Sequence, residues 1–406
     1  MKILHIMDMS HPMIKGYAIR ARYLCEAQRE VGHEVTVLTA PSQEEGRDDE
    51  GVLNGVRYFR SHCTHTEKRF ASFGVRQILY GRAVGRRLRA LTAADSYDVI
   101  HAHTPFTLAL PALRIAKTLA TPFVYEKRNL WEESARARGK LAGRWPFATL
   151  SRRFDRYVSR RADAVCTITE ALKLHTLRMG VPEDRVVVVG NGVDIDAFRP
   201  LKPPAALRQR LLQGGDFLIG FVGQFFRFEG LPLLVQAFRR LADQFPQARL
   251  ALVGYGEDRE RIEEAIRNQK LENACCLTGR VPHEKVRDHY AAMDVLVYPR
   301  LRSTLTEMIS PLKPLEPMAM GKPVVASDVG GLRELVAPGE SGYLFEAGSV
   351  TSLCAALRPF LDGNVNTEQL GQRARDYVEQ HRQWKHQAAK YEDAYRIALS
   401  ANPHKR

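Results

Sequence analysis

The chain has 406 residues, of which 45% are hydrophobic and 26% charged, so it is long enough for two or three domains with cores of ordinary composition. Its six cysteines show neither a disulfide framework nor metal-ligand spacing, which excludes a small disulfide-stabilised fold and predicts reduced cytosolic thiols. No run of 18 apolar residues is present to span a membrane, and Asp8 comes too early for a signal-peptide core.

Short apolar strands alternate with helical patterns along the chain. In the first half, strands are expected at Ile3–Met7, Glu34–Thr39, Val99–Ala102, Phe123–Tyr125 and Ala164–Thr167, with helices such as Ala18–Val31 and Thr107–Thr118. In the second half, strands are expected at Phe217–Val222, Arg249–Val253, Cys275–Leu277, Val295–Tyr298, Val324–Ala326 and Gly342–Leu344. This alternation predicts two α/β domains with parallel sheets.

The link between the two halves is predicted near residue 195, where Gly, Asn and Asp cluster in Gly190–Arg199. We therefore expect a first domain over 1–195 and a second over 196–375. One last helix is expected over about Thr367–Ser400, because Tyr377, Trp384, Tyr391 and Tyr395 recur at a spacing near seven. This spacing indicates a packing stripe.

The net charge is +14, and the positive excess is concentrated in Lys68–Arg161. Such a block attracts nucleic acid, anionic lipid headgroups or anionic substrates. It contains no zinc-finger, homeodomain or RNP signature, which argues against nucleic acid. Basic and apolar residues are interleaved in Arg69–Phe73 and Arg82–Leu91, as in interfacial helices. We expect contact with an anionic membrane surface, with an anionic soluble acceptor or a solvated surface as alternatives.

The segment Glu307–Glu316 combines two carboxylates, Lys313 and a predicted helix start. Free backbone N–H groups at a helix N-terminus beside a lysine favour a phosphate group. Glu316 lies one turn into this helix, where a carboxylate can bind the two hydroxyls of a ribose. The alternative is an amphipathic surface helix whose carboxylates only complement the helix dipole.

These residues resemble the donor-site motif of retaining glycosyltransferases of the GT-B fold, in the large family often called group 1 or family 4. Together with Tyr298-Pro299-Arg300, the segment Ser310–Glu316 more narrowly resembles the exosortase-associated exopolysaccharide subgroup. The resemblance covers nearly the whole chain, from Met1 to about Tyr395. It implies two Rossmann-like domains facing across a cleft, and a C-terminal helix, residues 376–406, that packs back on the first domain.

The resemblance also implies roles for individual residues. In the second domain and in the loop after the first strand, the donor-binding candidates are Gly16, Gly223, Arg227, Arg280, Val281, Ser310, Pro311, Leu312, Lys313 and Glu316. The catalytic candidates are His103, whose neutral imidazole would bind a sugar hydroxyl, and Glu307. Glu126 and Arg128 end a strand of the first domain and are acceptor-side candidates, with a surface salt bridge as the alternative.

Two positions depart from the family pattern. Gln224 and Glu229 stand where an Arg and a Lys usually neutralise the diphosphate. We expect Lys313 to supply the missing charge, with Arg227, Arg300 and Arg302 as further candidates.

His101 and His103 form the only His-x-His pair in the sequence, and no third metal ligand lies near them in the chain. We expect no metal site, and we expect His101 to point away from the side of the strand that His103 occupies.

The resemblance implies transfer of a sugar, with retention, from a nucleoside diphosphate sugar to a glycan hydroxyl on a lipid-linked acceptor, at the inner face of the cell membrane in exopolysaccharide or cell-surface glycan synthesis. No cofactor and no nucleic acid are expected. A sugar-nucleotide epimerase of the same architecture and a non-catalytic basic membrane-binding protein are the alternatives. A dehydrogenase would need a Gly-x-Gly-x-x-Gly turn after the first strand, which is missing.

Overall fold

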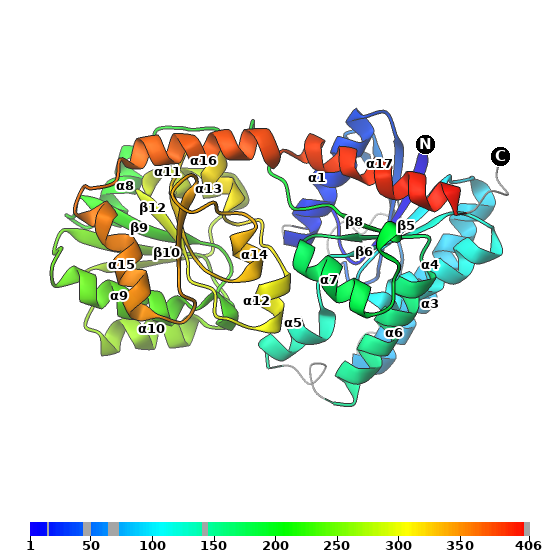
Figure 1. Ribbon diagram of the computed structural model, residues 1–406, viewed down its shortest axis with the longest axis horizontal. Helices are drawn as coiled ribbons and strands as arrows, with labels where there is room; N and C mark the ends of the chain where they lie inside the picture. The colour runs from blue at the N-terminus through cyan, green and yellow to red at the C-terminus, as the bar shows by residue number, and fades with distance from the viewer. Residues whose placement is uncertain (14–15, 44–49, 64–72, 140–144, 402–406) are drawn as a thin grey trace. The chain divides into compact units, whose positions relative to one another are not determined.

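The computed structural model describes residues 1–13, 16–43, 50–63, 73–139 and 145–401, and Figure 1 shows its helices and strands. The chain forms two compact units. The first unit contains Met1–Asn191 and Trp384–Arg406, and the second is Gly192–Gln383. Each unit has its own sheet and its own core, so the predicted class of two Rossmann-like parallel-sheet domains is confirmed.

The sheet of the first unit has the strand order β3-β4-β2-β1-β5-β6-β7-β8. Among the described strands, only β3 is antiparallel to its neighbour. The strands are β1 (Lys2–Met7), β2 (Glu34–Thr39), β3 (Glu50–Leu53), β4 (Val56–Arg60), β5 (Val99–His103), β6 (Phe123–Lys127), β7 (Ala164–Thr167) and β8 (Val186–Val188). The α-helices are α1 (Gly16–Glu30), α3 (Phe73–Ala94), α4 (Phe106–Thr118), α5 (Trp131–Ala137), α6 (Phe147–Arg161), α7 (Glu170–Arg178) and α17 (Trp384–Ser400).

The sheet of the second unit has the order β11-β10-β9-β12-β13-β14 and is parallel throughout its described strands. The strands are β9 (Phe217–Val222), β10 (Ala248–Val253), β11 (Cys275–Gly279), β12 (Val295–Tyr298), β13 (Val324–Ser327) and β14 (Gly342–Phe345). The α-helices are α8 (Ala205–Leu212), α9 (Leu231–Ala242), α10 (Arg259–Asn268), α11 (Val286–Ala292), α12 (Thr304–Met308), α13 (Leu315–Ala319), α14 (Gly330–Arg333), α15 (Val350–Leu361) and α16 (Thr367–His381).

Both sheets reverse their strand order once. In the first unit β1 pairs with β2 on one side and β5 on the other, and in the second β9 pairs with β10 and β12 in the same way. In open α/β sheets ligands bind outside the carboxyl ends of the strands at such a switch point. The candidate site of each unit is therefore expected at the ends of these strands.

The two faces of the first sheet are covered by different helices (Figure 1). Leu4, Ile100 and Ala102 pack in the core that includes α3 and α4. Ile3 and Val99, one residue away in their strands, pack instead with Leu24 of α1 and side chains of α17. This alternation is the period of two that a β-strand imposes.

The single C-terminal helix predicted over about Thr367–Ser400 is wrong, because the segment forms two helices, α16 and α17. Between them, the carbonyl of Arg382 accepts a hydrogen bond from the Val193 N–H at 2.8 Å, and Val193 and Gln383 form a parallel bridge. Backbone pairing with another segment replaces the helical pattern at this point. The helix α16 belongs to the second unit, and α17 packs on α1, β7 and β8 of the first.

Strands β3 and β4 were missed from the sequence. They form a hairpin closed by Asn54 and Gly55, both with positive φ, 48° and 76°. An Asn-Gly pair between two short strands is the strongest local hairpin signal, so the sequence did contain the information.

None of the described helices is long and apolar enough to cross a membrane.

Candidate functional site

The loop that follows β9 lies at the switch point of the second sheet and is crossed by the side chain of Lys313. Gly223 has φ +149°, and a Cβ at this residue would lie 2.5 Å from Lys313 Cε. Only glycine leaves room for the lysine to pass over the backbone. The Lys313 ammonium donates to the Gln224 carbonyl at 3.4 Å, so the cation is held against this loop.

Glu229 is buried and forms ion pairs with two basic residues that lie later in the chain. Its Oε1 lies 2.7 Å from Lys313 Nζ and 3.1 Å from Arg300 Nη2. Burial by itself would raise the pKa of this carboxyl, but Arg300 and Lys313 outweigh burial and hold the pKa below its ordinary value. The residue that departs from the family pattern therefore fixes Lys313 in place.

Arg300 also holds the loop between α12 and α13. Its Nη1 donates to the Ile309 carbonyl at 3.2 Å, and the Tyr298 hydroxyl donates to the Lys313 carbonyl at 3.0 Å. Ser310 and Pro311 of this loop are buried. The loop is thus anchored at both ends by side chains from the carboxyl end of β12.

Glu316 lies in the first turn of α13, which has only five residues and begins at Leu315. Its Oε2 accepts a hydrogen bond from the Tyr290 hydroxyl at 2.7 Å. Burial raises the pKa of Glu316 to about 7, although Tyr290 and Lys313 act in the opposite direction. Because the helix is so short, Lys313 rather than a helix dipole is the main positive group beside this carboxyl.

Glu307 lies in α12 and is held by two groups. Arg302 pairs with Oε1, and the backbone N–H of Gly330, which starts α14, donates to Oε2 at 2.8 Å. A Cβ at residue 330 would lie 2.3 Å from the Glu307 carbonyl oxygen, so a glycine is needed for this approach. No local sequence pattern marks Gly330 as a contact of Glu307.

Arg280 and Val281 follow β11, three strands from the end of β12 in the sheet. The Arg280 guanidinium lies over the ring of Tyr255, 5.2 Å from its centroid, and Gln224 Nε2 reaches the Tyr255 hydroxyl at 3.5 Å. The ends of β9, β10 and β11 are therefore connected through one exposed tyrosine. Arg227 is exposed and forms no ion pair within the described part of the chain.

Three histidines meet at the switch point of the first sheet, on β1 and β5. His5 pairs with His101 in the sheet register, and the rings of His101 and His103 stack at 4.5 Å. The expectation that His101 points away from His103 is wrong, because residues two apart in a strand lie on the same face. The third histidine, His5, is almost a hundred positions away in the chain, and sequence spacing could not reveal it.

The hydrogen bonds of this cluster define its ring protonation. Gln28 Oε1 can only accept, so His5 Nε2 donates to it at 2.7 Å. His5 Nδ1 then accepts from His103 Nε2 at 2.9 Å. Burial lowers the pKa of His5 and His103 well below the ordinary histidine value, which agrees with neutral rings.

The His5, His101 and His103 ring nitrogens lie within 4.8 Å of one another, close enough to hold a metal ion. The direct 2.9 Å hydrogen bond between two of these nitrogens occupies the lone pair that a metal would need. The cluster is therefore explained by hydrogen bonding among its own members. His103 is fully buried, and direct contact between its imidazole and a sugar stays a prediction.

Glu126 is the carboxylate around which this cluster is arranged. Arg20 donates to its Oε1 at 2.7 Å and the Tyr391 hydroxyl of α17 donates to its Oε2 at 2.8 Å. His101 Nε2 and His103 Nδ1 each lie 3.3 Å from Oε2. Burial would raise the pKa of Glu126, but the Arg20 guanidinium beside it holds that pKa well below its ordinary value.

Arg128, the other acceptor-side candidate, follows β6 and is 3% exposed. Its backbone N–H donates to Thr104 Oγ1 at 3.3 Å, and its guanidinium lies 5.7 Å from the ring centroid of Tyr17. Gly16, at the start of α1, is exposed and has open space around it, so the protein itself does not require glycine there.

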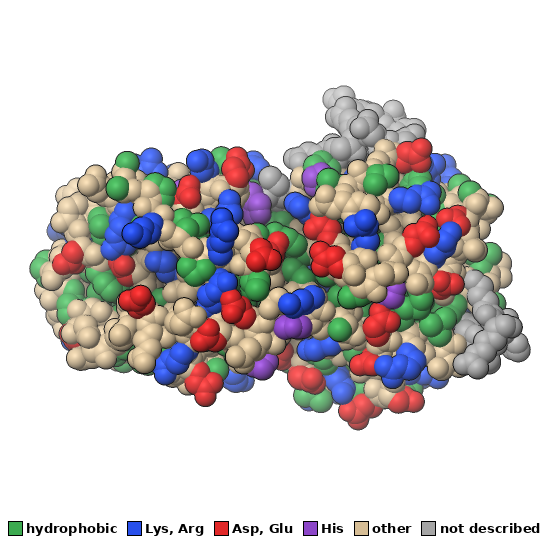
Figure 2. Space-filling model, turned by 90° about the horizontal axis from the view of Figure 1, so that it is seen from above, with side chains coloured by type: hydrophobic (Ala, Val, Ile, Leu, Met, Phe, Trp, Pro, Cys, Tyr) green, Lys and Arg blue, Asp and Glu red, His purple; other side chains and the backbone are tan. Residues whose placement is uncertain are grey.

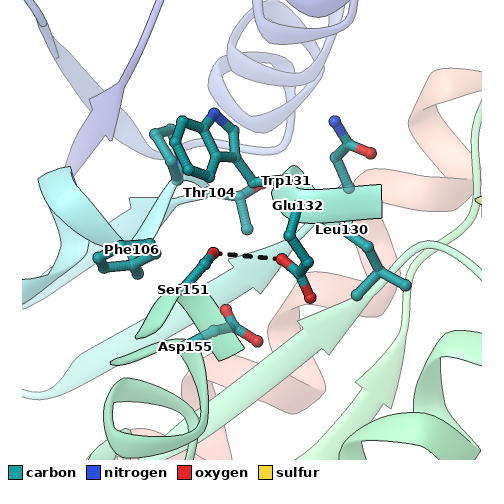
Figure 3. Close-up of a pocket in the computed structure, with 9 residues that line it drawn as sticks. Thr104, Phe106, Leu130, Trp131, Glu132, Ser151 and Asp155 are labelled. Carbon is teal, nitrogen blue, oxygen red and sulfur yellow. Dashed lines mark hydrogen bonds between the residues drawn. The ribbon is translucent and has the colours of Figure 1, made fainter. Parts of the chain in front are cut away.

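A small cavity opens beside these residues (Figure 3). In its wall the Ser151 hydroxyl donates to Glu132 Oε2 at 3.2 Å, and burial raises the pKa of Glu132. Asp155 is paired with Lys127 at 2.6 Å. The lining residues are Thr104, Pro105, Phe106, Asn129, Leu130, Trp131, Glu132, Ser151 and Asp155.

Two protein-family models match this chain, one in each half. Residues 14–197 match the family model described as Glycosyltransferase Family 4, and residues 204–377 match Glycosyl transferases group 1. The chain belongs to the group 1 and family 4 glycosyltransferases of the GT-B superfamily. The narrower exosortase-associated subgroup stays a prediction.

Among relatives of this glycosyltransferase is a GDP-mannose-dependent alpha-mannosyltransferase of Mycobacterium tuberculosis, 29% identical over 83% of this chain and 82% of the relative. Another is the sulfoquinovosyl transferase SQD2 of Arabidopsis thaliana, 26% identical over 91% of this chain and 68% of the relative.

Two solved structures show the same fold. Sucrose-phosphate synthase from Thermosynechococcus elongatus has a TM-score of 0.80 at 21% identity, covering 99% of this chain and 100% of that chain. Anabaena HepE in complex with UDP-glucose has a TM-score of 0.70 at 19% identity, covering 98% of each chain.

The raised pKa of Glu316 predicts a pH-dependent stability. Between its ordinary value and about 7, the folded state of this glycosyltransferase holds more protons than the unfolded state, so the contribution of Glu316 to stability falls as pH rises through that window. Glu316→Gln cannot ionise, so relative to wild type its stability should rise between pH 5 and pH 8, by roughly 1–3 kcal/mol. Thermal unfolding without ligand measures this, with exposed Glu340→Gln as control. A constant difference at both pH values would show that burial does not raise this pKa.

Proposed function

We propose that this glycosyltransferase moves a sugar from a nucleoside diphosphate sugar, bound by the second unit, to a hydroxyl of a lipid-linked glycan bound by the first. The transfer retains the anomeric configuration and belongs to the synthesis of an exopolysaccharide or another cell-surface glycan. The observation that carries the proposal is the ion pair that holds Lys313 against Gly223 at the switch point of the second sheet. The named donors and bound nucleotides of the relatives support the same class of substrate.

Lys313 has the hydrogen-bonding capacity to bind a diphosphate. Its ammonium has three N–H groups, of which one points to Glu229 and one to the Gln224 carbonyl. The third is left for a phosphate oxygen. Lys313, Arg300 and Glu229 together carry one net positive charge, so this cluster attracts an anion even though a carboxylate lies at its centre.

The proposed mechanism is a front-face displacement. The bond between the anomeric carbon and the diphosphate oxygen breaks, the acceptor oxygen forms its bond on the same face, and the acceptor proton passes to the departing phosphate oxygen. Lys313 stabilises the negative charge that develops on the diphosphate. Glu307, held by the Gly330 N–H, is the proposed contact to sugar hydroxyls, and Glu316 the contact to the ribose. We propose no metal and no cofactor.

Loss of the Lys313 ammonium should weaken binding in proportion to phosphate content. We expect Lys313→Ala to bind the nucleoside diphosphate about ten- to a hundred-fold more weakly, the value of one charged hydrogen bond, while the nucleoside alone loses little. Titration calorimetry with both ligands measures the difference. Lys285→Ala, an exposed lysine of the same unit, serves as control. Equal losses for nucleoside and nucleoside diphosphate would mean that Lys313 only supports the loop.

A screen of UDP-, GDP- and ADP-sugars for slow donor hydrolysis tests the reaction itself. We expect one class of donor to be consumed, with the anomer released first having the configuration of the donor, as read by NMR. Glu307→Gln should cut turnover at least tenfold while leaving nucleoside diphosphate affinity within about twofold, because its contact is to the sugar. Release of the inverted anomer would reject retention, and normal turnover by the variant would remove Glu307 from the site.

The first unit carries an exposed apolar and basic surface that supports membrane contact. Just before α6, Trp145 is 82% exposed, and Leu150 in the first turn of this helix is 53% exposed. Phe147 and Tyr157 are each 42% exposed on the same helix. The described arginines exposed beside them are Arg153, Arg156, Arg160 and Arg161. An interfacial helix combines aromatic side chains with arginines in this way.

The interfacial segments expected from the sequence lie elsewhere. Residues 69–72 fall outside the described residues. Arg82–Leu91 lies in α3, where Val84, Leu88 and Leu91 are buried against the core. On the face of the molecule seen in Figure 2, Lys and Arg side chains are mixed with Asp and Glu. The α6 surface is therefore the better candidate for membrane docking.

Vesicle co-sedimentation tests this surface. We expect salt-sensitive binding to anionic vesicles, since each basic residue near an anionic membrane contributes about 1 kcal/mol. The double variant Trp145→Ser/Leu150→Ser should bind at least tenfold more weakly, because burying one such side chain is worth about 1.5–3 kcal/mol. Val52→Ser, exposed in β3, is the matched control. Wild-type protein that stays in the supernatant at low salt would reject membrane contact.

A further inference from the structure

The guanidinium of Arg128 is buried at the carboxyl end of β6 without a partner of opposite charge. Its Nε and Nη1 are enclosed and make no hydrogen bond within the described part of the chain. A buried donor without an acceptor costs free energy, and for an ionised group the cost is greater. Buried polar groups in native proteins are nearly always hydrogen-bonded, so an orphaned buried guanidinium calls for an explanation.

The charges that face Arg128 do not neutralise it. They are Glu126 and Arg20, while Tyr17 and Tyr391 are the other titratable neighbours. Glu126 is already paired with Arg20 at 2.7 Å, and the neighbouring histidines are held neutral by burial. Because Glu126 is paired with Arg20 and no ion pair to Arg128 is present among the described residues, this buried cluster has one positive charge in excess.

The residue before Arg128 makes the contrast clear. Lys127 is also buried, and its ammonium is paired with Asp155 at 2.6 Å. Of these two adjacent buried cations, Lys127 is therefore paired with a carboxylate and, among the described residues, Arg128 is not. The Arg128 guanidinium therefore retains unused hydrogen-bond donors and a positive charge, both of which favour an anionic ligand.

We infer that Arg128 binds a phosphate group of a ligand, through the bidentate geometry that a guanidinium offers to phosphate oxygens. Tyr17 covers the guanidinium with a ring that is 42% exposed and whose hydroxyl is tied to Asn129 at 2.6 Å. The ligand reaches Arg128 by displacing this ring. The cavity of Figure 3 is lined by Asn129, the next residue in the chain, and by Thr104, whose Oγ1 accepts a hydrogen bond from the Arg128 N–H.

The inference rests on the proposed function for the source of the phosphate. The donor diphosphate and the phosphate of a lipid-linked acceptor share the chemistry that a guanidinium recognises. Paired probes distinguish the two sources. One pair is the nucleoside diphosphate that stabilises wild type and its nucleoside, and the other is farnesyl phosphate and farnesol in detergent.

Binding to the full chain, measured by calorimetry, tests the inference. Arg128→Gln should bind one phosphate-bearing probe ten- to a hundred-fold more weakly and its phosphate-free counterpart within twofold. Loss for the nucleoside diphosphate assigns Arg128 to the donor, and loss for farnesyl phosphate assigns it to the acceptor. Arg128→Lys, which keeps the charge without the fork, should show an intermediate loss. Arg114→Gln, an exposed arginine on α4, is the control.

Thermal unfolding without ligand separates a binding role from a structural one. Because Arg128 is an uncompensated buried charge, the ligand-free Arg128→Gln variant should melt at the wild-type temperature or above. Unchanged affinity for both phosphate probes, equal losses for phosphate-free probes, no wild-type binding of either phosphate probe, or a large drop in melting temperature would each overturn the inference. Wild-type donor hydrolysis, measured in parallel, shows whether the proposed function stands when this inference fails.

Discussion

The ion pair between Glu126 and Arg20 connects the parts of the first unit that are far apart in the sequence. Glu126 ends β6, Arg20 belongs to α1, and Tyr391, which also binds Glu126, comes from the last helix. Arg20 further donates to Asn191 Oδ1 at 2.9 Å, at the point where the chain leaves the unit. Removing one partner of such a buried pair costs about 3–5 kcal/mol, because the other charge is left alone.

The same carboxylate explains why polar side chains occupy the sheet face under α17. The strands β1 and β5 place His5, His101 and His103 on the same sheet face as Ile3 and Val99, which precede them by two or four residues in these strands. Four of the six ring nitrogens are hydrogen-bonded, to Gln28, to Tyr395 and to each other, while His101 Nε2 and His103 Nδ1 lie 3.3 Å from Glu126 Oε2 without a hydrogen bond. The directional bonds of this network fix the ring orientations at the strand ends more specifically than an apolar core would.

The second unit repeats the arrangement with different residues. Glu229 is its buried carboxylate, and the cations around it, Lys313 and Arg300, come from a loop and from the end of β12. In the proposed function, Lys313 takes the place of the cation that the family pattern has at residue 229, and Glu229 holds this lysine beside Gly223.

Much of this protein follows from local sequence. Alternating apolar strands and helical patterns give the two parallel sheets, since strand period and helix period are properties of short segments. The loop after α12 and the residues around Lys313 are also recognisable, because Pro311 and Pro314 restrict the backbone within a few residues. The hairpin at Asn54 and Gly55 is a local feature of the same kind, since an Asn-Gly pair favours the positive φ angles of a tight turn.

Only the tertiary structure determines which polar and charged side chains come into contact. His5 joins His101 across about a hundred residues, and Glu126 meets Tyr391 across more than two hundred, so no spacing rule connects them. The break between α16 and α17 depends on Val193, which pairs with the chain there from a distant segment. Local sequence determines whether a segment favours a helix, a strand or a turn. Which polar groups are buried, and therefore need a hydrogen-bond or ion-pair partner, is determined only when the sheets and helices pack together.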